Sequence, residues 1–298
     1  MTRSLFLFLF LIGAVAEARL RVAATTSDVA ALTREVGQDL IEVTALAKGT
    51  QDPHMVEAKP SLMIKLRDVD LVISQGLELE TAWLDPLIRG ARNPKLAEAN
   101  HLLELGPFLK PIEIPTKALT RADGDIHGGG NPHFQLDPVR LGEAAVIIGA
   151  RLGELDGTNK AQYVKNAQAF QKRMNEKTAE WQGRLKKAGL TEAVTYHKLL
   201  SYFCDRFQIR CTVQLEPKPG VPPSASHLLS VIEQIKERKI RLVAIENLYD
   251  DAAGEKLKQA LPGLKVSRVA VSVEGEPALK TNEQVIENLV QIFEGAAK

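Results

Sequence analysis

Three histidines lie in segments where side chains could build a reactive or binding site. His54 follows a proline in "QDPHMVEAKP", His133 follows another in "GGGNPHFQLDP", and His197 ends "EAVTYH". A neutral imidazole is a common metal ligand, and the neighbouring prolines restrict the backbone that carries two of these rings. Their spacing matches no short zinc motif such as H-E-x-x-H. Spacing alone therefore suggests a metal site without defining one.

Short apolar runs alternate with helical patterns on both sides of one long uninterrupted stretch. We expect strands at 20–27, 40–47 and 71–76, and again at 192–197, 209–216, 240–247 and 264–272. Helical patterns follow most of these strands, which predicts parallel sheets covered by helices. Ligands of such sheets bind beyond the carboxyl ends of the strands, where His54 and His197 lie.

Residues from Lys160 to about Lys187 contain no proline and predict a helix about 42 Å long. The apolar positions of this stretch, which we take to include Ala179, do not hold a heptad, so we expect a rigid strut between two domains rather than a coiled coil. The resulting division is a signal peptide at 1–18, an N-terminal α/β lobe at 19–156, a linking helix at 157–188 and a C-terminal α/β lobe at 189–298.

The first 18 residues have the layout of a cleavable secretory signal. Arg3 is followed by an apolar run from Leu5 to Val15 and by the small-x-small triplet Ala16-Glu17-Ala18. The run is about half the ~20 residues that a membrane span needs. No cysteine follows it, so we do not expect lipid attachment there. We expect a mature protein that starts near Arg19 and is exported from the cytoplasm.

Charge and cysteine content narrow the remaining classes. The formal net charge is +1, and basic residues are dispersed among acidic ones, which argues against nucleic acid or an anionic membrane as the main partner. The two cysteines are Cys204 and Cys211. In an oxidising compartment they could pair, and they could equally be two small buried apolar residues. Both alternatives remain open from the sequence.

Several segments resemble those of the cluster A-I solute-binding proteins, which deliver zinc or manganese to ABC transporters. The similar segments are "QDPHMVEAKPS", "ISQGLELETAWLDPL", "NPHFQLDP", "TYHKLLSYFCDRF" and "EPKPGVPPSASHL", and they appear in the family's order over most of the chain. The resemblance implies an α/β fold with two Rossmann-like lobes, each with a parallel sheet, joined by one long rigid helix. It also implies a monomeric binding protein, not an enzyme, whose partner is a membrane permease.

Carried over residue by residue, the resemblance implies that the metal ligands are His54, His133 and His197. Three imidazoles suit zinc better than manganese, which prefers oxygen ligands. Manganese-handling members tend to replace the third histidine by a carboxylate, so His197 also indicates Zn²⁺. The expected function is therefore high-affinity periplasmic zinc binding for uptake.

The fourth ligand does not transfer from the family. An aspartate is common on the loop after the last strand, but the matching position here is near Ser272. Glu274, Glu246 or a water molecule could complete the coordination instead, and the sequence leaves this open.

The loop 121–130, "RADGDIHGGG", resembles the His- and acid-rich loop of zinc-binding members, but it offers only His127, Asp123 and Asp125. We expect a flexible linker rather than a metal-collecting loop. His101 and His227 have no expected special role.

Two other functions are compatible with three histidines. A secreted zinc hydrolase would keep an open water position on the metal and would need a general base, for which Glu57 is the nearest candidate. The other alternative is a manganese-binding or adhesin-type relative with the same fold.

Overall fold

The computed structural model describes residues 19–120, 124 and 126–296 of the 298-residue chain. The signal peptide predicted at 1–18 lies outside these residues, as do Asp123 and Asp125. Within the described part of the chain, no helix is both long and apolar enough to span a bilayer.

Two four-stranded sheets form the two halves of the molecule, and all the paired strands are parallel. The first has the order β2-β1-β3-β4 and the second β6-β5-β7-β8, so each repeats the same order counted from its own first strand. Parallel pairing confirms the expected α/β class. The strands are β1 (Leu20–Ala24), β2 (Ile41–Ala45), β3 (Leu71–Ser74), β4 (Leu102–Glu104), β5 (Glu192–Thr195), β6 (Arg210–Gln214), β7 (Leu242–Glu246) and β8 (Lys265–Val269).

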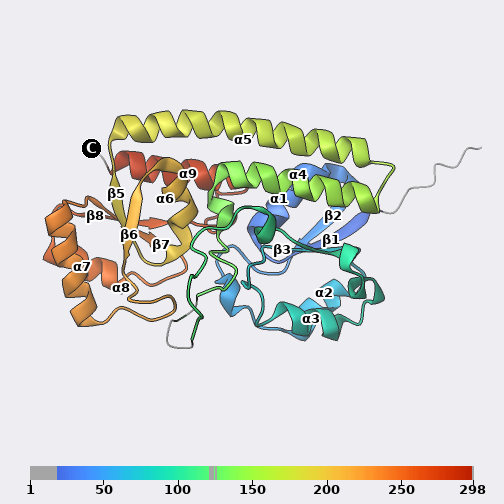
Figure 1. The fold of residues 1–298 in the computed structure, drawn as a ribbon, viewed down its shortest axis with the longest axis horizontal. Helices are drawn as coiled ribbons and strands as arrows, with labels where there is room; N and C mark the ends of the chain where they lie inside the picture. The colour runs from blue at the N-terminus through green and yellow to red at the C-terminus, as the bar shows by residue number, and fades with distance from the viewer. Residues whose placement is uncertain (1–18, 121–123, 125, 297–298) are drawn as a thin grey trace, which may run out of the picture.

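Helices connect these strands and pack on the sheets (Figure 1). The first lobe carries α1 (Ser27–Gly37), α2 (Pro60–Leu66) and α3 (Leu84–Ala91), and α4 (Pro138–Leu155) leads to the long helix α5 (Lys160–Ala188). The second lobe carries α6 (Ser201–Phe207), α7 (Ala225–Arg238), α8 (Ala252–Ala260) and α9 (Asn282–Gly295).

Helix α5 has 29 residues and runs along both lobes, with α4 packed along one part and α9 along another (Figure 1). It confirms the predicted long helix, although the domain boundaries at 156 and 189 stay a prediction. Its buried face is regular once Thr178 is counted, so the expectation of an irregular stripe was wrong. Thr178 takes the buried place that we had given to Ala179. The buried residues are Tyr163, Ala167, Phe170, Met174, Thr178, Trp181 and Leu185, spaced by three or four.

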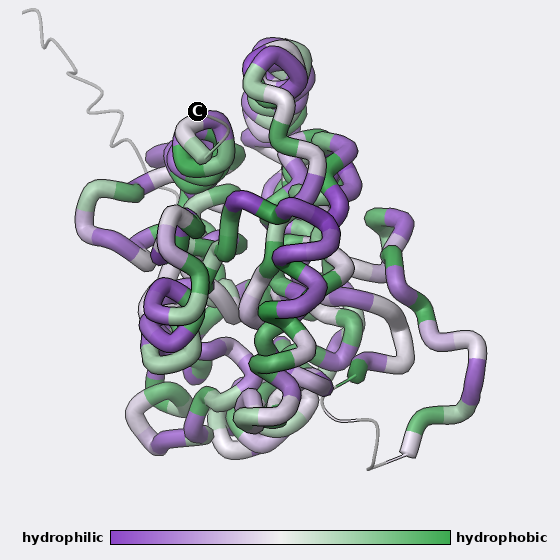
Figure 2. The backbone as a smooth tube through the Cα atoms, turned by 90° about the vertical axis from the view of Figure 1, so that its left-hand side faces the viewer, coloured by the Kyte–Doolittle hydropathy of each residue, from purple (hydrophilic) through white to green (hydrophobic). Residues whose placement is uncertain are grey.

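This stripe packs against other helices of the same chain. One apolar core includes buried residues of α1, α4, α5 and α9, and it therefore reaches into both lobes. Seen end-on at the top of Figure 2, α5 carries hydrophilic and hydrophobic residues around its circumference, as a helix with one buried face should.

Candidate metal centre

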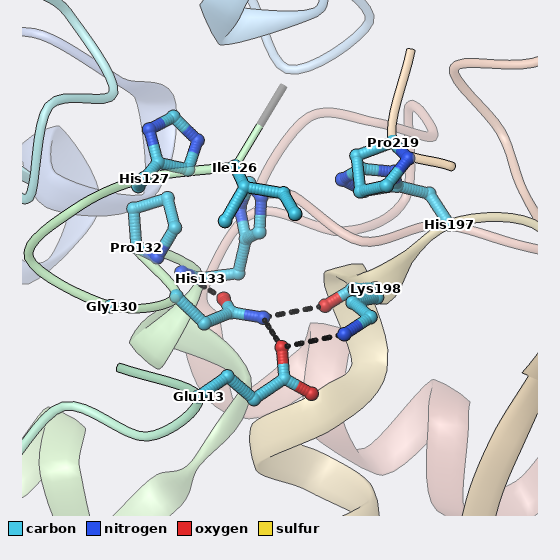
Figure 3. Close-up of a pocket in the computed structure, with 10 residues that line it drawn as sticks. Glu113, Ile126, His127, Gly130, Pro132, His133, His197, Lys198 and Pro219 are labelled. Carbon is cyan, nitrogen blue, oxygen red and sulfur yellow. Dashed lines mark hydrogen bonds and ion pairs between the residues drawn. The ribbon is translucent and has the colours of Figure 1, made fainter. Parts of the chain in front are cut away.

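The three predicted histidines meet between the two lobes. Ring centroids are 5.3 Å apart for His54 and His133, 6.2 Å for His54 and His197, and 6.0 Å for His133 and His197. His133 is only 1% exposed and His197 6%. In Figure 3 His133 and His197 face the same pocket from opposite sides. The structure thus brings together all three residues that the sequence singled out.

Each histidine lies in or immediately before a single turn of 3-10 helix. His54 belongs to Pro53–Met55, His133 precedes Phe134–Leu136, and His197 precedes Lys198–Leu200. Short polar side chains hold the first two turns, because Asp52 accepts the backbone N–H of His54 and Asn131 accepts that of His133, both at 2.9 Å. These contacts hold the backbone of the two turns that carry the rings.

Carboxylates orient two of the imidazoles. Nδ1 of His54 lies 2.8 Å from Oδ1 of Asp52, and Nδ1 of His197 lies 2.7 Å from Oε2 of Glu216. Burial alone would raise the pKa of Asp52, but the hydrogen bond and charge of His54 outweigh it and lower that pKa. A carboxylate on one ring nitrogen leaves the other to face a metal, an arrangement common among ligating histidines.

His133 has no hydrogen-bond partner for either ring nitrogen, and both nitrogens are buried. Burial, together with repulsion from the neighbouring His54, His197 and His127, lowers its pKa well below the ordinary value, so the ring stays neutral. Leaving a buried polar group unpaired costs on the order of 1–3 kcal/mol. A metal ion would satisfy one nitrogen and remove part of that cost.

The spacing of the rings is close to that of a zinc site. Zinc–nitrogen bonds of about 2.0–2.1 Å at tetrahedral angles place imidazole centroids about 5 Å apart. The pair His54–His133 matches at 5.3 Å, whereas both pairs that include His197 are about 1 Å longer. As the side chains stand, no group of three or more His, Cys, Asp or Glu within the described residues has the geometry of a metal site. Binding would therefore draw His197, from the second lobe, toward the other two.

A group of polar contacts between the lobes, made by Asn131, Lys198, Ser201 and Glu113, borders the same pocket. The side chain of Asn131 donates to the carbonyl of Lys198 at 2.9 Å, and Lys198 Nζ lies 3.6 Å from Glu113 (Figure 3). The hydroxyl of Ser201 donates to Glu113 at 3.1 Å. Since Asn131 and Lys198 are close neighbours in the chain of His133 and His197, these contacts join the segments that carry those two rings.

The fourth-ligand candidates are engaged elsewhere. Glu246 is fully buried and accepts the backbone N–H groups of Tyr196 at 2.9 Å and His197 at 3.3 Å, and burial raises its pKa to about 8. Glu274 lies 3.5 Å from Lys280 with most of its side chain exposed. Both carboxylates thus have structural partners of their own.

The structure places a fourth histidine, His127, beside His54, although sequence analysis did not predict it as a metal ligand. The ring of His127 stacks on that of His54 with centroids 5.2 Å apart, and the two Nε2 atoms are separated by 3.1 Å. The linker role expected for this loop stays a prediction, while its described residues 126–130 include a ring that contacts His54. The resemblance of the loop to a His-rich one was the signal that could have identified it.

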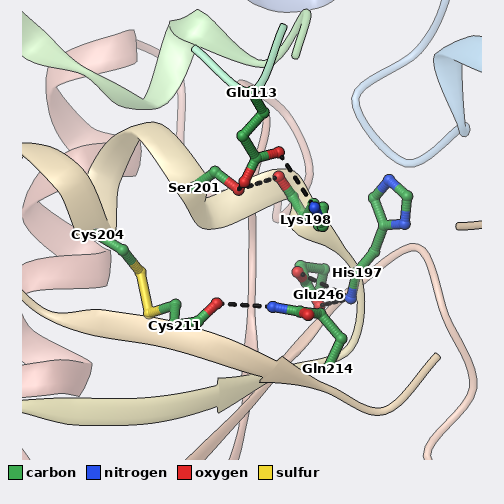
Figure 4. Close-up of a disulfide and its surroundings, with 8 residues drawn as sticks. All are labelled: Glu113, His197, Lys198, Ser201, Cys204, Cys211, Gln214 and Glu246. Atoms are coloured by element: carbon green, nitrogen blue, oxygen red, sulfur yellow. Dashed lines mark hydrogen bonds and ion pairs between the residues drawn. A yellow bond between two sulfur atoms is a disulfide. The ribbon is translucent and has the colours of Figure 1, made fainter. Parts of the chain in front are cut away.

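Cys204 and Cys211 form a disulfide, which decides between the two alternatives left open above. It ties α6 to β6, and α6 begins four residues after His197 (Figure 4). The predicted general base Glu57 is 77% exposed on its side chain and pairs with Lys59 at 3.2 Å. A hydrolase would need that base inside the site.

Comparison with known proteins extends these observations. The family model "Zinc-uptake complex component A periplasmic" matches residues 22–296. The lipoprotein SsaB of Streptococcus sanguinis, a metal ABC transporter substrate-binding protein, is 24% identical over 288 residues, covering 94% of this chain and 90% of its own. The manganese-binding relative ScaA of Streptococcus gordonii is also 24% identical, with the same coverage over 295 residues.

A crystal structure of ZnuA has the same fold as this chain. It superposes with a TM-score of 0.80 at 22% identity and covers 94% of this chain and 100% of its own. Two lobes, a long connecting helix and a family match over nearly the whole described chain agree with one another. The chain belongs to the ZnuA family, the extracytoplasmic metal-binding components of ABC transporters, which are solute-binding proteins and not enzymes.

Proposed function

We propose that this protein binds one zinc ion between its lobes, with His54, His133 and His197 as ligands, and delivers it to the permease of an ABC importer. The observation that carries the proposal is the meeting of three imidazoles around His133, whose buried nitrogens have no other partner. Nothing else described in the pocket would satisfy them. The protein acts in the periplasm as a monomer and carries the ion as cargo.

The donor set favours zinc over manganese. Imidazole nitrogens suit Zn²⁺, whereas Mn²⁺ prefers carboxylate, carbonyl and water oxygens. Two carboxylates beside the site, Asp52 and Glu216, contact Nδ1 of their histidines, the ring nitrogens opposite Nε2. Manganese remains the alternative because relatives such as ScaA are named for it.

Metal titration tests the assignment. The stripped protein should bind one zinc per chain in competition with a chromophoric chelator, and a large excess of manganese should not displace it. His133→Ala should lower zinc affinity by at least 100-fold, because it removes a buried ligand and leaves the fold in place. The matched control is His101→Ala, whose ring contacts the carbonyl of Asp70 away from the site. Equal affinity for His133→Ala and the unmodified protein would exclude the proposed site, and preferential manganese binding would reverse the choice of metal.

A further inference from the structure

We propose that His127 is the fourth metal ligand, so that four imidazoles and no carboxylate hold the ion. The proposal rests on the proposed function, since it completes the same site. It assigns to the segment 126–130 a direct role in coordination in place of the linker role expected from the sequence.

The first argument is the distance between ring nitrogens. Two nitrogens bound to one tetrahedral zinc at 2.0–2.1 Å lie about 3.3 Å apart. The Nε2 atoms of His54 and His127 are 3.1 Å apart, and their centroids are 5.2 Å apart, which also matches two ligands of one ion. Nδ1 of His54 contacts Asp52, and its Nε2 faces Nε2 of His127. His127 thus meets the zinc geometry at least as well as His197 does.

The second argument is that the chain holds this segment in place. The backbone N–H of Gly128 donates to Oε2 of Glu78 at 2.6 Å. Glu78 and its neighbour Leu77 both have positive φ, 70° and 55°, a conformation that non-glycine residues seldom adopt and that occurs at functional sites. The segment's close fit requires glycine at residue 130, because a Cβ there would lie 2.9 Å from the carbonyl oxygen of Ile112.

The third argument is the position of the segment across the pocket. His127 and Ile126 line the same pocket as His133 and His197, and the opposite wall includes Pro219 of the second lobe (Figure 3). Gly124 packs against that proline closely enough that a Cβ on it would lie 2.5 Å from the carbonyl oxygen. Coordination by His127 would therefore cover the ion as well as bind it.

The fourth argument is chemical. Glu246 and Glu274 are held by other partners, so neither of these two candidates is placed to fill the fourth position. A fourth imidazole makes the donor set wholly nitrogen, which deepens the preference for zinc over manganese. Selectivity would then depend partly on His127.

Counting the imidazoles around bound metal tests the proposal directly. X-ray absorption of the zinc-loaded, full-length protein should show four imidazole ligands, and the His127→Ala variant should show three. We expect the zinc affinity of the His127→Ala variant to fall by more than about tenfold. Removing even a residue that only hydrogen-bonds to a metal ligand lowers metal affinity by about that much. The matched control is His101→Ala, which removes an imidazole that contacts the carbonyl of Asp70 away from the site and should keep four imidazoles at the metal.

The possible results separate this proposal from the proposed function. Three imidazoles in the unmodified protein, or a His127→Ala variant with unchanged coordination, would overturn the role of His127 while His133→Ala still abolished tight binding. If His133→Ala also had no effect, the proposed function itself would fail. A His127 that merely stacks on His54 could alter affinity, but it would not change the number of coordinated imidazoles.

Glu78 provides a second test because it positions the segment without contacting metal. Glu78→Ala removes the acceptor for Gly128, and we expect weaker zinc binding with four imidazoles retained. Glu78→Gln keeps a carbonyl oxygen at that place and should restore most of the affinity. Equal affinity for Glu78→Ala and the unmodified protein would show that the strained turn does not hold His127 in place.

Discussion

At the scale of single residues, the site combines two histidines that are paired with carboxylates and one buried histidine whose ring nitrogens have no partner. His133 stays neutral because burial and neighbouring rings lower its pKa, while His54 and His197 are oriented by Asp52 and Glu216. A neutral ring with a fixed orientation loses little freedom when it binds metal.

The orienting carboxylates give a prediction at this scale. Asp52→Asn and Glu216→Gln should each lower zinc affinity by roughly 10–100-fold. The carboxylate's hydrogen bond orients the imidazole and makes it more basic, and each substitution weakens that hydrogen bond. Competitive titration measures this loss. Glu57→Gln is the control, since Glu57 pairs with Lys59 at the surface and should have no effect. If Asp52→Asn and Glu216→Gln bound zinc as tightly as Glu57→Gln and the unmodified protein, these carboxylates would not orient the ligands.

At the scale of elements, a buried ion pair joins the helix that follows His133 to the helix that follows His197. Asp137 caps α4 and has no exposed surface, and both its oxygens accept from Arg206 of α6 at 2.8 Å. Arg140 lies against the same carboxylate. The disulfide fixes the far side of α6, so this helix is anchored at two points.

Breaking that pair should destabilise the fold. Arg206→Ala leaves the buried Asp137 with Arg140 as its remaining cation and the backbone N–H of Val139. We therefore expect a loss of about 3 kcal/mol, the lower end for a buried pair that loses one partner. Denaturant unfolding of the metal-free protein measures it. The control is Arg268→Ala, which breaks a half-exposed pair with Asp251 and should cost less than about 1 kcal/mol. Equal losses would show that the α4–α6 pair is not structurally important.

At the scale of the whole molecule, the lobes contact each other through α1 and the chain after β8. Asp28 of α1 accepts the N–H of Val273 at 2.9 Å, and its own carbonyl accepts from Asn282 of α9 at 3.3 Å. Burial raises the pKa of Asp28 to about 7, although Val273 and Ser272 act in the opposite direction. Between about pH 4 and 7 the folded protein therefore holds a proton on this carboxyl that the unfolded chain has lost.

This carboxyl predicts how stability depends on pH. Between pH 4 and 7 the folded state binds more protons at Asp28 than the unfolded state, so stability should fall as pH rises, by on the order of a few kcal/mol. Asp28→Asn should flatten this dependence in urea unfolding at pH 4.5, 6 and 8, whereas the exposed Asp39→Asn should not. The buried Glu80 and Glu246 also have raised pKa values, that of Glu246 to about 8, so Asp28→Asn should keep a residual slope comparable to the part that Asp28 contributes. Parallel curves for Asp28→Asn and the unmodified protein would contradict the assignment.

Much of the architecture was predictable because its signals are local. Alternating apolar runs and helical patterns identified the parallel sheets, and the absence of proline after residue 160 predicted α5 to within a residue of its observed bounds, Lys160–Ala188. The burial of Thr178 was not predicted because threonine is a polar residue. Its hydroxyl can be buried here because it donates to the carbonyl of Met174 at 2.6 Å.

The sequence by itself determined the residue types of the site, the turns that carry them and the elements that space them, since composition and periodicity act within a few residues. Only the tertiary structure decided which donors meet. His127 lies 73 residues from His54, yet their Nε2 atoms are 3.1 Å apart. Glu246, a candidate fourth ligand, instead accepts a hydrogen bond from the backbone N–H of Tyr196. Such encounters depend on how two lobes close on each other, and no local pattern in the chain encodes that distance.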